Sequence, residues 1–145
     1  MKLKKETDYA LRIVFYLSSI YLESSNKITD SKTISKAENI PEFFCLKILK
    51  KLKQADIVNI YRGVNGGYLL NKNPSQISLG KIIHIIENNN SISDCICEPD
   101  SCSNNRGSYC PVRISLSLIQ NEFFKSMEKI SFYDILNANF FKILK

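Results

Sequence analysis

Residues 57–70 read IVNIYRGVNGGYLL, two runs of β-prone residues separated by a turn rich in glycine and asparagine, residues 63–67. Because glycine and asparagine tolerate positive φ angles, this pattern predicts a β-hairpin with Arg62 near its tip. The hairpin directly follows a lysine-rich stretch with helical periodicity, residues 41–54. A basic helix followed by a basic hairpin is the outline of a winged helix-turn-helix, and it predicts DNA binding.

The helix expected from Pro41 has an apolar face and a basic face. Proline suits the first position of a helix, where an N–H group would have no intrahelical partner. The buried stripe includes Cys45, which we interpret as a small core residue rather than a reactive one. The opposite face and the hairpin supply the residues predicted to contact DNA, which are Phe43, Lys47, Lys50, Arg62 and Gly63.

Helical periodicity places further helices on both sides of this unit, at about residues 7–22, 31–38 and 79–88. The lone His84 on the third of these is interpreted as a surface or packing residue. We therefore expect a mainly α fold with a small β-hairpin wing. The winged helix-turn-helix takes up residues 1–77, and residues 78–145 hold a cysteine loop and a long C-terminal dimerisation helix, all in one compact unit.

The long helix expected at about residues 110–129 carries apolar residues at spacings of 4, 3, 4, 4 and 3, close to those of a coiled-coil seam. Because this apolar seam lies outside the small core, we expect another surface to cover it, and a second copy of the chain in a two-fold dimer is the preferred interpretation. Packing against its own chain is the alternative. The expected dimerisation residues are Val112, Leu116, Ile119, Phe123, Met127 and Ile130.

The net charge of +6 is unevenly distributed along the chain. Residues 1–81 hold 14 Lys and Arg against 7 Asp and Glu, whereas residues 82–145 hold 6 against 7. All of the excess positive charge therefore lies in the half that contains the basic helix and hairpin. This coincidence favours neutralisation of DNA phosphates over an ordinary solvated basic face.

The sequence also argues against secretion, membrane insertion and catalysis. The apolar stretch near the start follows Glu6 and Asp8 and is interrupted by Arg12, so we do not interpret it as a signal peptide. No stretch approaches the roughly 18 to 20 apolar residues that span a bilayer. Neither a nucleophile with its base nor a phosphate-binding glycine loop is recognisable. We expect a cytoplasmic protein that is not an enzyme.

Four of the five cysteines lie in or directly beside a turn-rich loop expected at residues 88–109 and form the pattern C-x-C-x4-C-x7-C. Three or four thiolates on a flexible loop suit one soft metal centre, and an iron-sulfur cluster is the preferred interpretation. The paired C-x-x-C knuckles typical of structural zinc are absent from the sequence. Reversible thiol oxidation without a metal is the second interpretation, and zinc or inert cysteines the third. The cysteines are Cys95, Cys97, Cys102 and Cys110.

Taken together, these motifs resemble the Rrf-two (Rrf2) family of bacterial transcription regulators over nearly the whole chain. The motifs that carry the resemblance are Thr7 to Arg12, Ile40-Pro41, Ile48 to Leu52, Arg62-Gly63 with Gly66 to Leu70, Ser78-Leu79-Gly80, the cysteine loop, and Ile130 to Leu136. The resemblance implies a homodimeric winged-helix protein that binds near-palindromic DNA and is expected to act as a repressor. It also implies a two-iron or four-iron cluster that senses iron-sulfur status, nitric oxide or redox state.

The resemblance further implies ligands for that cluster. Three cysteines match the ligand positions of the family, namely Cys95, Cys102 and Cys110. IscR-like members have a histidine three residues after the third cysteine, but Arg113 stands there in this chain. In NsrR-like members an acidic residue of the partner's first helix completes the site, and Asp8 holds that position, although a carboxylate there could simply stabilise the helix N-terminus. Cys97 is the other possible fourth ligand.

Two alternatives from other classes remain open at this point. The first is a cluster-free regulator of the CymR kind, which responds to thiol oxidation or to a partner protein. The second is a small metal-cysteine enzyme or an electron carrier, for which a winged helix has no use.

Overall fold

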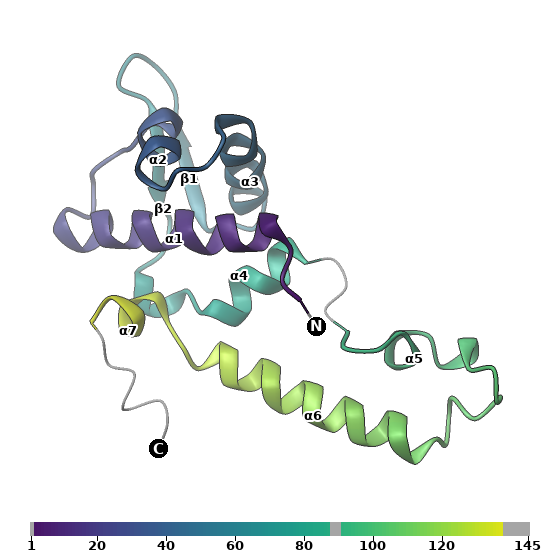
Figure 1. Cartoon of the computed structure of the whole chain (residues 1–145). Helices are drawn as coiled ribbons and strands as arrows, with labels where there is room; N and C mark the ends of the chain where they lie inside the picture. The colour runs from purple at the N-terminus through teal and green to yellow at the C-terminus, as the bar shows by residue number, and fades with distance from the viewer. Residues whose placement is uncertain (1, 88–90, 138–145) are drawn as a thin grey trace.

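The computed structural model describes residues 2–87 and 91–137, and Figure 1 shows the arrangement of the elements. They are, in order, α1 (Lys5–Glu23), α2 (Ser31–Ala37), α3 (Glu42–Gln54), β1 (Val58–Tyr61), β2 (Gly67–Leu70), η1 (Pro74–Gln76), α4 (Leu79–Ile86), α5 (Asp94–Cys97), η2 (Pro99–Ser101), α6 (Pro111–Glu128) and α7 (Phe132–Leu136). The first four α-helices, the hairpin and α7 form a body, from which α5, η2 and α6 extend to one side. The mainly α fold with a β-hairpin is the one predicted.

Helix α1 lies at the centre of the body, with α2 and α3 on one side and α4 and α7 on the other (Figure 1). Its apolar face is buried because the residues at helical spacing all point toward these neighbours. The same holds for the predicted inner faces of α3 and α4. The fully buried side chains include Ile13, Val14, Ile48, Leu49, Leu52, Ile82 and, from α7, Phe132.

The hairpin pairs β1 with β2 in antiparallel register, from Val58 opposite Leu70 to Tyr61 opposite Gly67. Its turn depends on Gly63, whose φ of 112° lies in the region that side chains with a Cβ rarely adopt. Both findings agree with the hairpin predicted from the glycine-rich stretch.

One further backbone pairing widens the hairpin at its outer edge. The N–H of Thr29 donates to the carbonyl of Tyr68 at 3.0 Å, and the N–H of Tyr68 donates back to Thr29 at 2.8 Å. A Cβ atom on Gly67 would lie 2.5 Å from the Thr29 carbonyl oxygen, so this approach requires a glycine. The segment before α2 is thereby tied to the wing, which the sequence did not predict.

The helix ends lie within two residues of those expected from the sequence. Ser131 and Asp134 form a capping box at the start of α7. Pro41, expected as the first helical residue, is the N-cap of α3, with a ψ of 133°. Its carbonyl accepts the N–H of Cys45 at 3.1 Å. Proline fits this position as well, because its φ of −56° is compatible with extended backbone and no N–H is needed.

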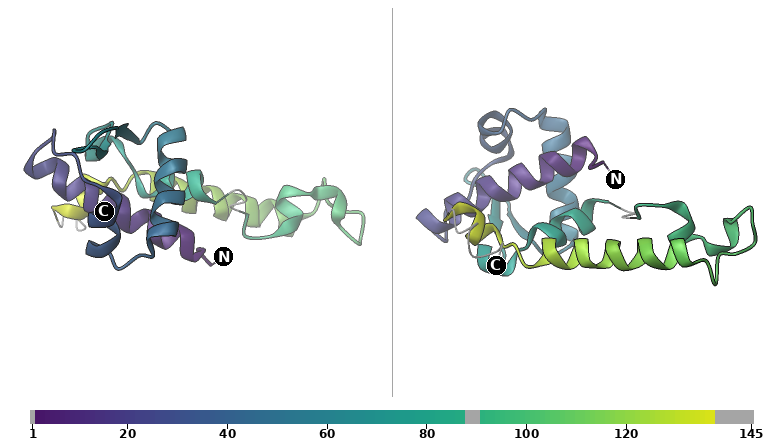
Figure 2. Two further views of the ribbon diagram at one scale, coloured as in Figure 1. Left: turned by 90° about the horizontal axis from the view of Figure 1, so that it is seen from above. Right: turned by 60° about the horizontal axis from the view of Figure 1, so that its bottom comes forward.

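The region expected to be a long loop has secondary structure of its own. It contains α5 and η2, and the buried Gly107 lies against Pro99, where a Cβ atom would collide with the proline carbonyl oxygen. The helix expected to reach Asn88 ends at Ile86, and Asn88 itself lies outside the described residues. The views in Figure 2 show α5 and α6 running side by side away from the body. Over residues 2–87 and 91–137, no helix has both the length and the apolar character that a membrane crossing requires.

Candidate nucleic-acid interface and cysteine site

The outward face of α3 carries the residues expected to read DNA. Phe43 is 73% exposed, and its ring forms a T-shaped pair with the Phe44 ring at a centroid distance of 5.8 Å. Lys50 is exposed, as predicted, and Lys47 lies on the same face. The four residues of the opposite stripe are fully buried, namely Cys45, Ile48, Leu49 and Leu52. Burial, with the nearby charge of Glu42, raises the pKa of the Cys45 thiol to about 11, which fits the core role assigned to it.

Two lysines of α3 are engaged by a carboxylate of α1 that the sequence reasoning missed. Glu6 Oε2 lies 3.3 Å from Nζ of Lys47, and Oε1 lies 2.8 Å from Nζ of Lys51. Burial acts to raise the pKa of Glu6, but the hydrogen bonds and charges of both lysines outweigh it and lower that pKa. The available signal was the i, i+4 spacing of the lysines together with an acidic residue in the first turn of a neighbouring helix.

The wing exposes its basic residue in the loop between its two strands. Arg62 and Gly63 are exposed in the loop between β1 and β2, where Val64 is also fully exposed. The loop is closed by a hydrogen bond from the N–H of Gly66 to the carbonyl of Gly63, 3.0 Å long. Helix α3 and the wing loop both lie on the side of the body that faces away from α6 (Figure 1).

The four cysteines of the predicted sensor all lie in the extension, at the far end of α6. Cys95 and Cys97 belong to α5, Cys102 follows η2, and Cys110 is the N-cap of α6. All five cysteines of the chain, including Cys45, carry thiols rather than disulfides. In the described part of the chain, no group of three or more His, Cys, Asp or Glu is arranged to hold a metal ion. The structure therefore brings the predicted ligands into one region without gathering them at one point.

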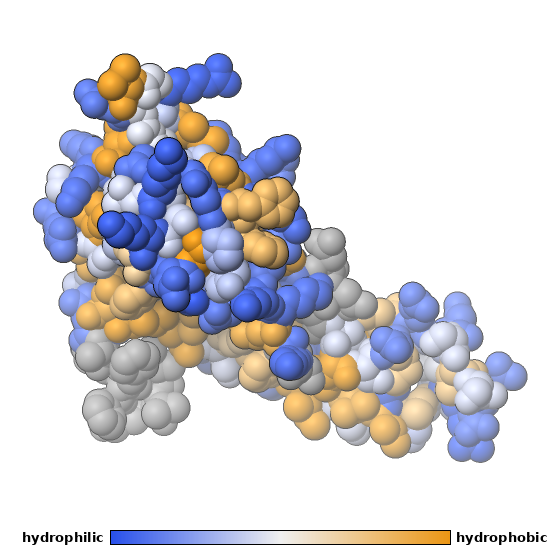
Figure 3. Space-filling view, turned by 45° about the horizontal axis from the view of Figure 1, so that its top comes forward, coloured by the Kyte–Doolittle hydropathy of each residue, from blue (hydrophilic) through white to orange (hydrophobic). Residues whose placement is uncertain are grey.

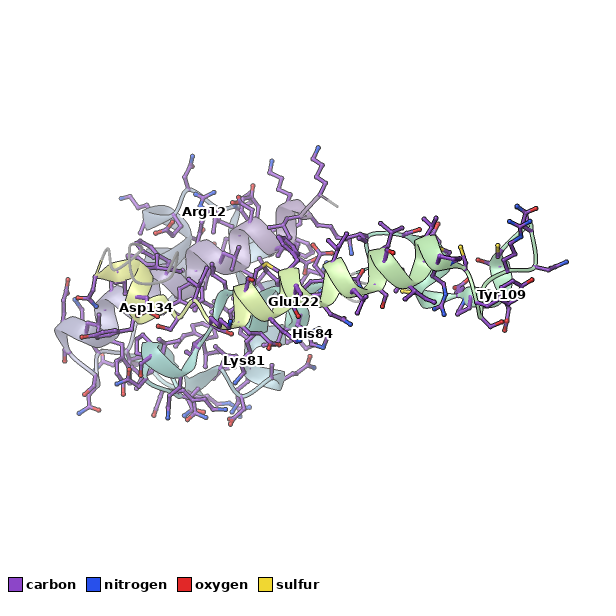
Figure 4. All side chains as sticks on the ribbon, turned by 90° about the horizontal axis from the view of Figure 1, so that it is seen from below. Arg12, Lys81, His84, Tyr109, Glu122 and Asp134 are labelled. Carbon is purple, nitrogen blue, oxygen red and sulfur yellow. The ribbon has the colours of Figure 1, made fainter. Side chains whose placement is uncertain are left out.

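Two of these cysteines have polar groups close to the sulfur atom. The backbone N–H groups of Arg106 and Asn104, and the charge of Arg106, lower the pKa of the Cys102 thiol. The hydroxyl of Ser93 lies 3.2 Å from the sulfur of Cys95. Figure 4 shows the labelled Tyr109 of this region at the far tip of the molecule, with Asp134 at the opposite end of α6.

Asp8, the candidate fourth ligand from a partner subunit, lies on α1 with a side chain that is 60% exposed. Its carboxylate oxygen is 3.6 Å from a guanidinium nitrogen of Arg12, one turn further along the helix. Arg12 also pairs with Glu38 at 3.5 Å and lies over the ring of Tyr9. Asp8 thus has one long ion pair and a large solvent-facing surface.

A second carboxylate missed by the sequence reasoning lies where the body meets the extension. Glu87 directly follows α4 and is 8% exposed. It accepts hydrogen bonds from Oγ1 of Thr7 at 2.5 Å and from the N–H of Lys4 at 3.0 Å, and it pairs with Nζ of Lys4 at 2.9 Å. Burial acts to raise the pKa of Glu87, but these partners outweigh it and lower that pKa.

Helix α6 carries the predicted seam as exposed apolar surface. Val112, Ile119 and Phe123 are 66%, 63% and 46% exposed, whereas the other three seam residues are half-buried. The half-buried residues are Leu116, Met127 and Ile130. Another side of α6 packs on α4 and α5, and none of its 18 residues is fully buried. In Figure 3 an apolar band runs along this extension.

The helix-turn-helix, the hairpin wing and the long helix beside them define a winged-helix protein. Residues 3–138 match the model of the Rrf2 family, described as iron-dependent transcriptional regulators. The chain belongs to the Rrf2 family. It is therefore a winged-helix transcription regulator, and membership of this family implies DNA binding.

Several known proteins are similar to this chain over most of their length. The transcriptional regulator NsrR of Oceanobacillus iheyensis is 29% identical over 137 residues, which are 94% of this chain and 90% of that one. The structure of T. potens IscR matches with a TM-score of 0.74 and 19% identity, over 96% of this chain and 88% of that one. CymR of B. subtilis, the global cysteine regulator, matches with a TM-score of 0.66 and 22% identity, over 95% and 98%. At these identities the two solved structures support the fold alone.

Proposed function

We propose that this chain acts as a homodimer that represses transcription from a near-palindromic operator and senses its signal through an iron-sulfur cluster on the extension. One observation carries the proposal. The cysteines sit at the far end of a helix whose apolar seam is exposed, while the basic face of α3 and the wing lie on the opposite side of the body. Sensor, dimer interface and DNA reader thus occupy three separate parts of one chain.

The roles proposed at the DNA follow from side-chain chemistry. Phe43, Lys47 and Lys50 enter the major groove on α3, where an apolar ring suits a thymine methyl group and a lysine suits the acceptors of guanine. Arg62 and the backbone at Gly63 approach a phosphate or the minor groove from the wing. The dimer sets the spacing of two such readers, so the operator is nearly palindromic.

The proposal of an iron-sulfur cluster rests on the cysteine thiolates available as ligands. Soft thiolates are the ligands that iron-sulfur clusters require, and Cys95, Cys102 and Cys110 are half-buried in the short segment that contains α5 and η2 and leads into α6. The fourth position is taken by Cys97 or by the partner subunit's Asp8, whose exposed carboxylate is free to reach outward. A bound cluster would supply a centre that exchanges electrons and reacts with oxidants or nitric oxide.

Purification without oxygen, followed by iron and acid-labile sulfide analysis, tests this proposal. We expect brown protein that contains iron and sulfide in equal amounts and that retards a duplex selected from a random library. Colourless protein without iron that nevertheless binds the duplex would overturn the cluster while leaving the DNA-binding role intact.

A thiol sensor without a cluster is the second candidate function, and the lowered pKa of Cys102 favours it. A thiolate formed at lower pH reacts faster with oxidants. This candidate predicts that colourless anaerobic protein changes its affinity for the selected duplex when peroxide is added, and that dithiothreitol reverses the change. A variant of this candidate responds to a partner protein instead of an oxidant.

A further inference from the structure

Two ion pairs link Glu6 of α1 to lysines of α3, the helix that we propose reads DNA. We propose that Glu6 is a specificity-determining residue, which holds Lys47 and Lys51 against α1 and so withholds them from the phosphates of non-operator DNA. The inference rests on the proposed function, in which α3 reads the operator.

The geometry assigns one carboxylate oxygen of Glu6 to each lysine. Lys47 and Lys51 are one helical turn apart on α3, at 3.3 Å from Oε2 and 2.8 Å from Oε1. The Glu6 side chain is 18% exposed, so solvent screens these pairs less than it screens an ordinary surface ion pair. Asp8, two residues further on, is 60% exposed and pairs with Arg12 of its own helix. The two acidic residues at the start of α1 therefore serve different partners.

The pairing affects random DNA and operator DNA differently. Binding to random sequence comes almost wholly from phosphates neutralised by lysine and arginine. A carboxylate beside two lysines cancels one of their charges and repels an approaching phosphate. Reading a base edge instead requires a donor in a fixed place, and the ammonium of Lys47 keeps donors to spare while one of them points at Glu6. Glu6 thus weakens non-specific binding more than it weakens the specific contact.

A purely structural role for Glu6 makes a different prediction. Ion pairs near the surface contribute only about 0.2 to 1 kcal/mol to stability. The contact between α1 and α3 is instead maintained by buried apolar side chains, among them Ile13, Val14, Ile48 and Leu49. Removing the charge of Glu6 should therefore leave the fold and its melting temperature nearly unchanged, and any change in DNA binding would reflect the two lysines.

The test compares E6Q with E23Q in the full chain. Glu23 ends the same helix and is exposed, so E23Q changes the net charge by the same amount away from α3. Affinities are measured at several potassium chloride concentrations, for a duplex selected with the parent protein and for a scrambled duplex of equal length. We expect E6Q to bind the scrambled duplex about 3- to 10-fold more tightly, with a salt slope steeper by about one ion. Its affinity for the selected duplex should change less than about two-fold, so that discrimination falls.

The control and a third variant separate the possible failures. In the E6Q/K51Q double variant the gain on scrambled DNA should shrink, because one of the two released lysines is gone. If E6Q behaves like E23Q, or strengthens both duplexes equally, Glu6 does not determine specificity. If K47A and K51A also bind both duplexes as the parent does, the assignment of α3 as reader fails, and the role of Glu6 fails with it.

Discussion

The body and the extension of this molecule differ in how far their apolar side chains are buried. The body buries the apolar faces of α1, α3 and α4 against one another, with many side chains fully enclosed, whereas α6 has none enclosed in 18 residues. Burying a large apolar side chain stabilises a fold by about 1.5 to 3 kcal/mol. The exposed apolar side chains of the α6 seam do not make this contribution to the stability of the isolated chain. The packing of the body is therefore complete within this chain, whereas under the proposed function the extension is completed by a partner subunit over its seam and by a cluster at its cysteines.

Backbone hydrogen bonds join the two regions where the start of α4 lies beside the segment between α6 and α7. The N–H of Leu79 donates to the carbonyl of Ile130 at 2.9 Å, and the N–H of Phe132 donates to Ile77 at the same distance. Phe132 itself is buried in the body, so α7 anchors the end of α6. Under the proposed function, we expect a change at the cysteines to reach the body through this junction of α4, α6 and α7.

The largest effect is expected in the extension, at the cysteines. Replacing Cys102 or Cys110 by alanine should abolish or destabilise the chromophore of protein purified without oxygen, because each change removes a thiolate that no neighbour is placed to replace. Visible absorbance and iron content measure the outcome. Cys95 and Cys97 are separated by one residue on α5 and can substitute for each other, so we expect only their double replacement to be as severe.

Two further variants show whether this effect belongs to the extension alone. C45A should keep the colour and cost about 1 kcal/mol or more of stability through a cavity in the core of the body. D8A should change the spectrum or speed cluster loss if the partner's Asp8 is a ligand, and an unchanged spectrum would assign the fourth position to Cys97 or to an exogenous thiol. Loss of colour in C45A would contradict the division between body and extension.

The next largest effect concerns the seam. Replacing Ile119 and Phe123 by glutamate places charge on exposed apolar surface that we expect to be buried in a dimer. The variant should sediment as a monomer and bind the selected duplex at least about 100-fold more weakly, because the contacts of the second half-site are lost. L118E is the matched control, since Leu118 is 62% exposed and lies on another face of α6. A parent protein that is monomeric at micromolar concentration would refute the proposal that the seam forms a dimer interface.

A smaller effect is expected within the body. There the variants K47A and R62A distinguish recognition of bases from sequence-independent contact with DNA. K47A should relax sequence preference, and R62A should weaken binding to all duplexes, each by roughly 1 to 3 kcal/mol on the affected contact. Competition between selected and scrambled duplexes separates the two outcomes. Parent-like binding by both variants would mean that the recognition surface lies elsewhere on the body.

The sequence predicted the body better than it predicted the extension, and for a physical reason. Helical periodicity located the faces of α1, α3 and α4, and Gly63 located the turn of the wing, because these signals are local. Pairings between residues far apart left no such local signal, so the contacts of Glu6 with Lys47 and of Thr29 with Tyr68 were missed. The cysteine pattern predicted that four cysteines lie near one another but not how they are arranged. The short α5 and η2 were expected to be loop, since four or three residues are too few for a periodic pattern.

The smallest effect is expected at Glu87, where the two regions join. E87Q keeps a side chain able to accept from Thr7 and from the backbone of Lys4, but it removes the charge that both partners stabilise, which we expect to cost about 1 kcal/mol at pH 7. Because the pKa of Glu87 is lowered in the folded chain, its contribution is complete above the usual glutamate pKa and is lost as pH falls through the lowered value. The difference in unfolding free energy between parent and E87Q, measured in urea from pH 7 downward, should therefore shrink toward zero in acid. E23Q, with its exposed carboxylate, should match the parent throughout, and a difference for E87Q that persists or grows in acid would show that Glu87 does not stabilise the fold as a charged group.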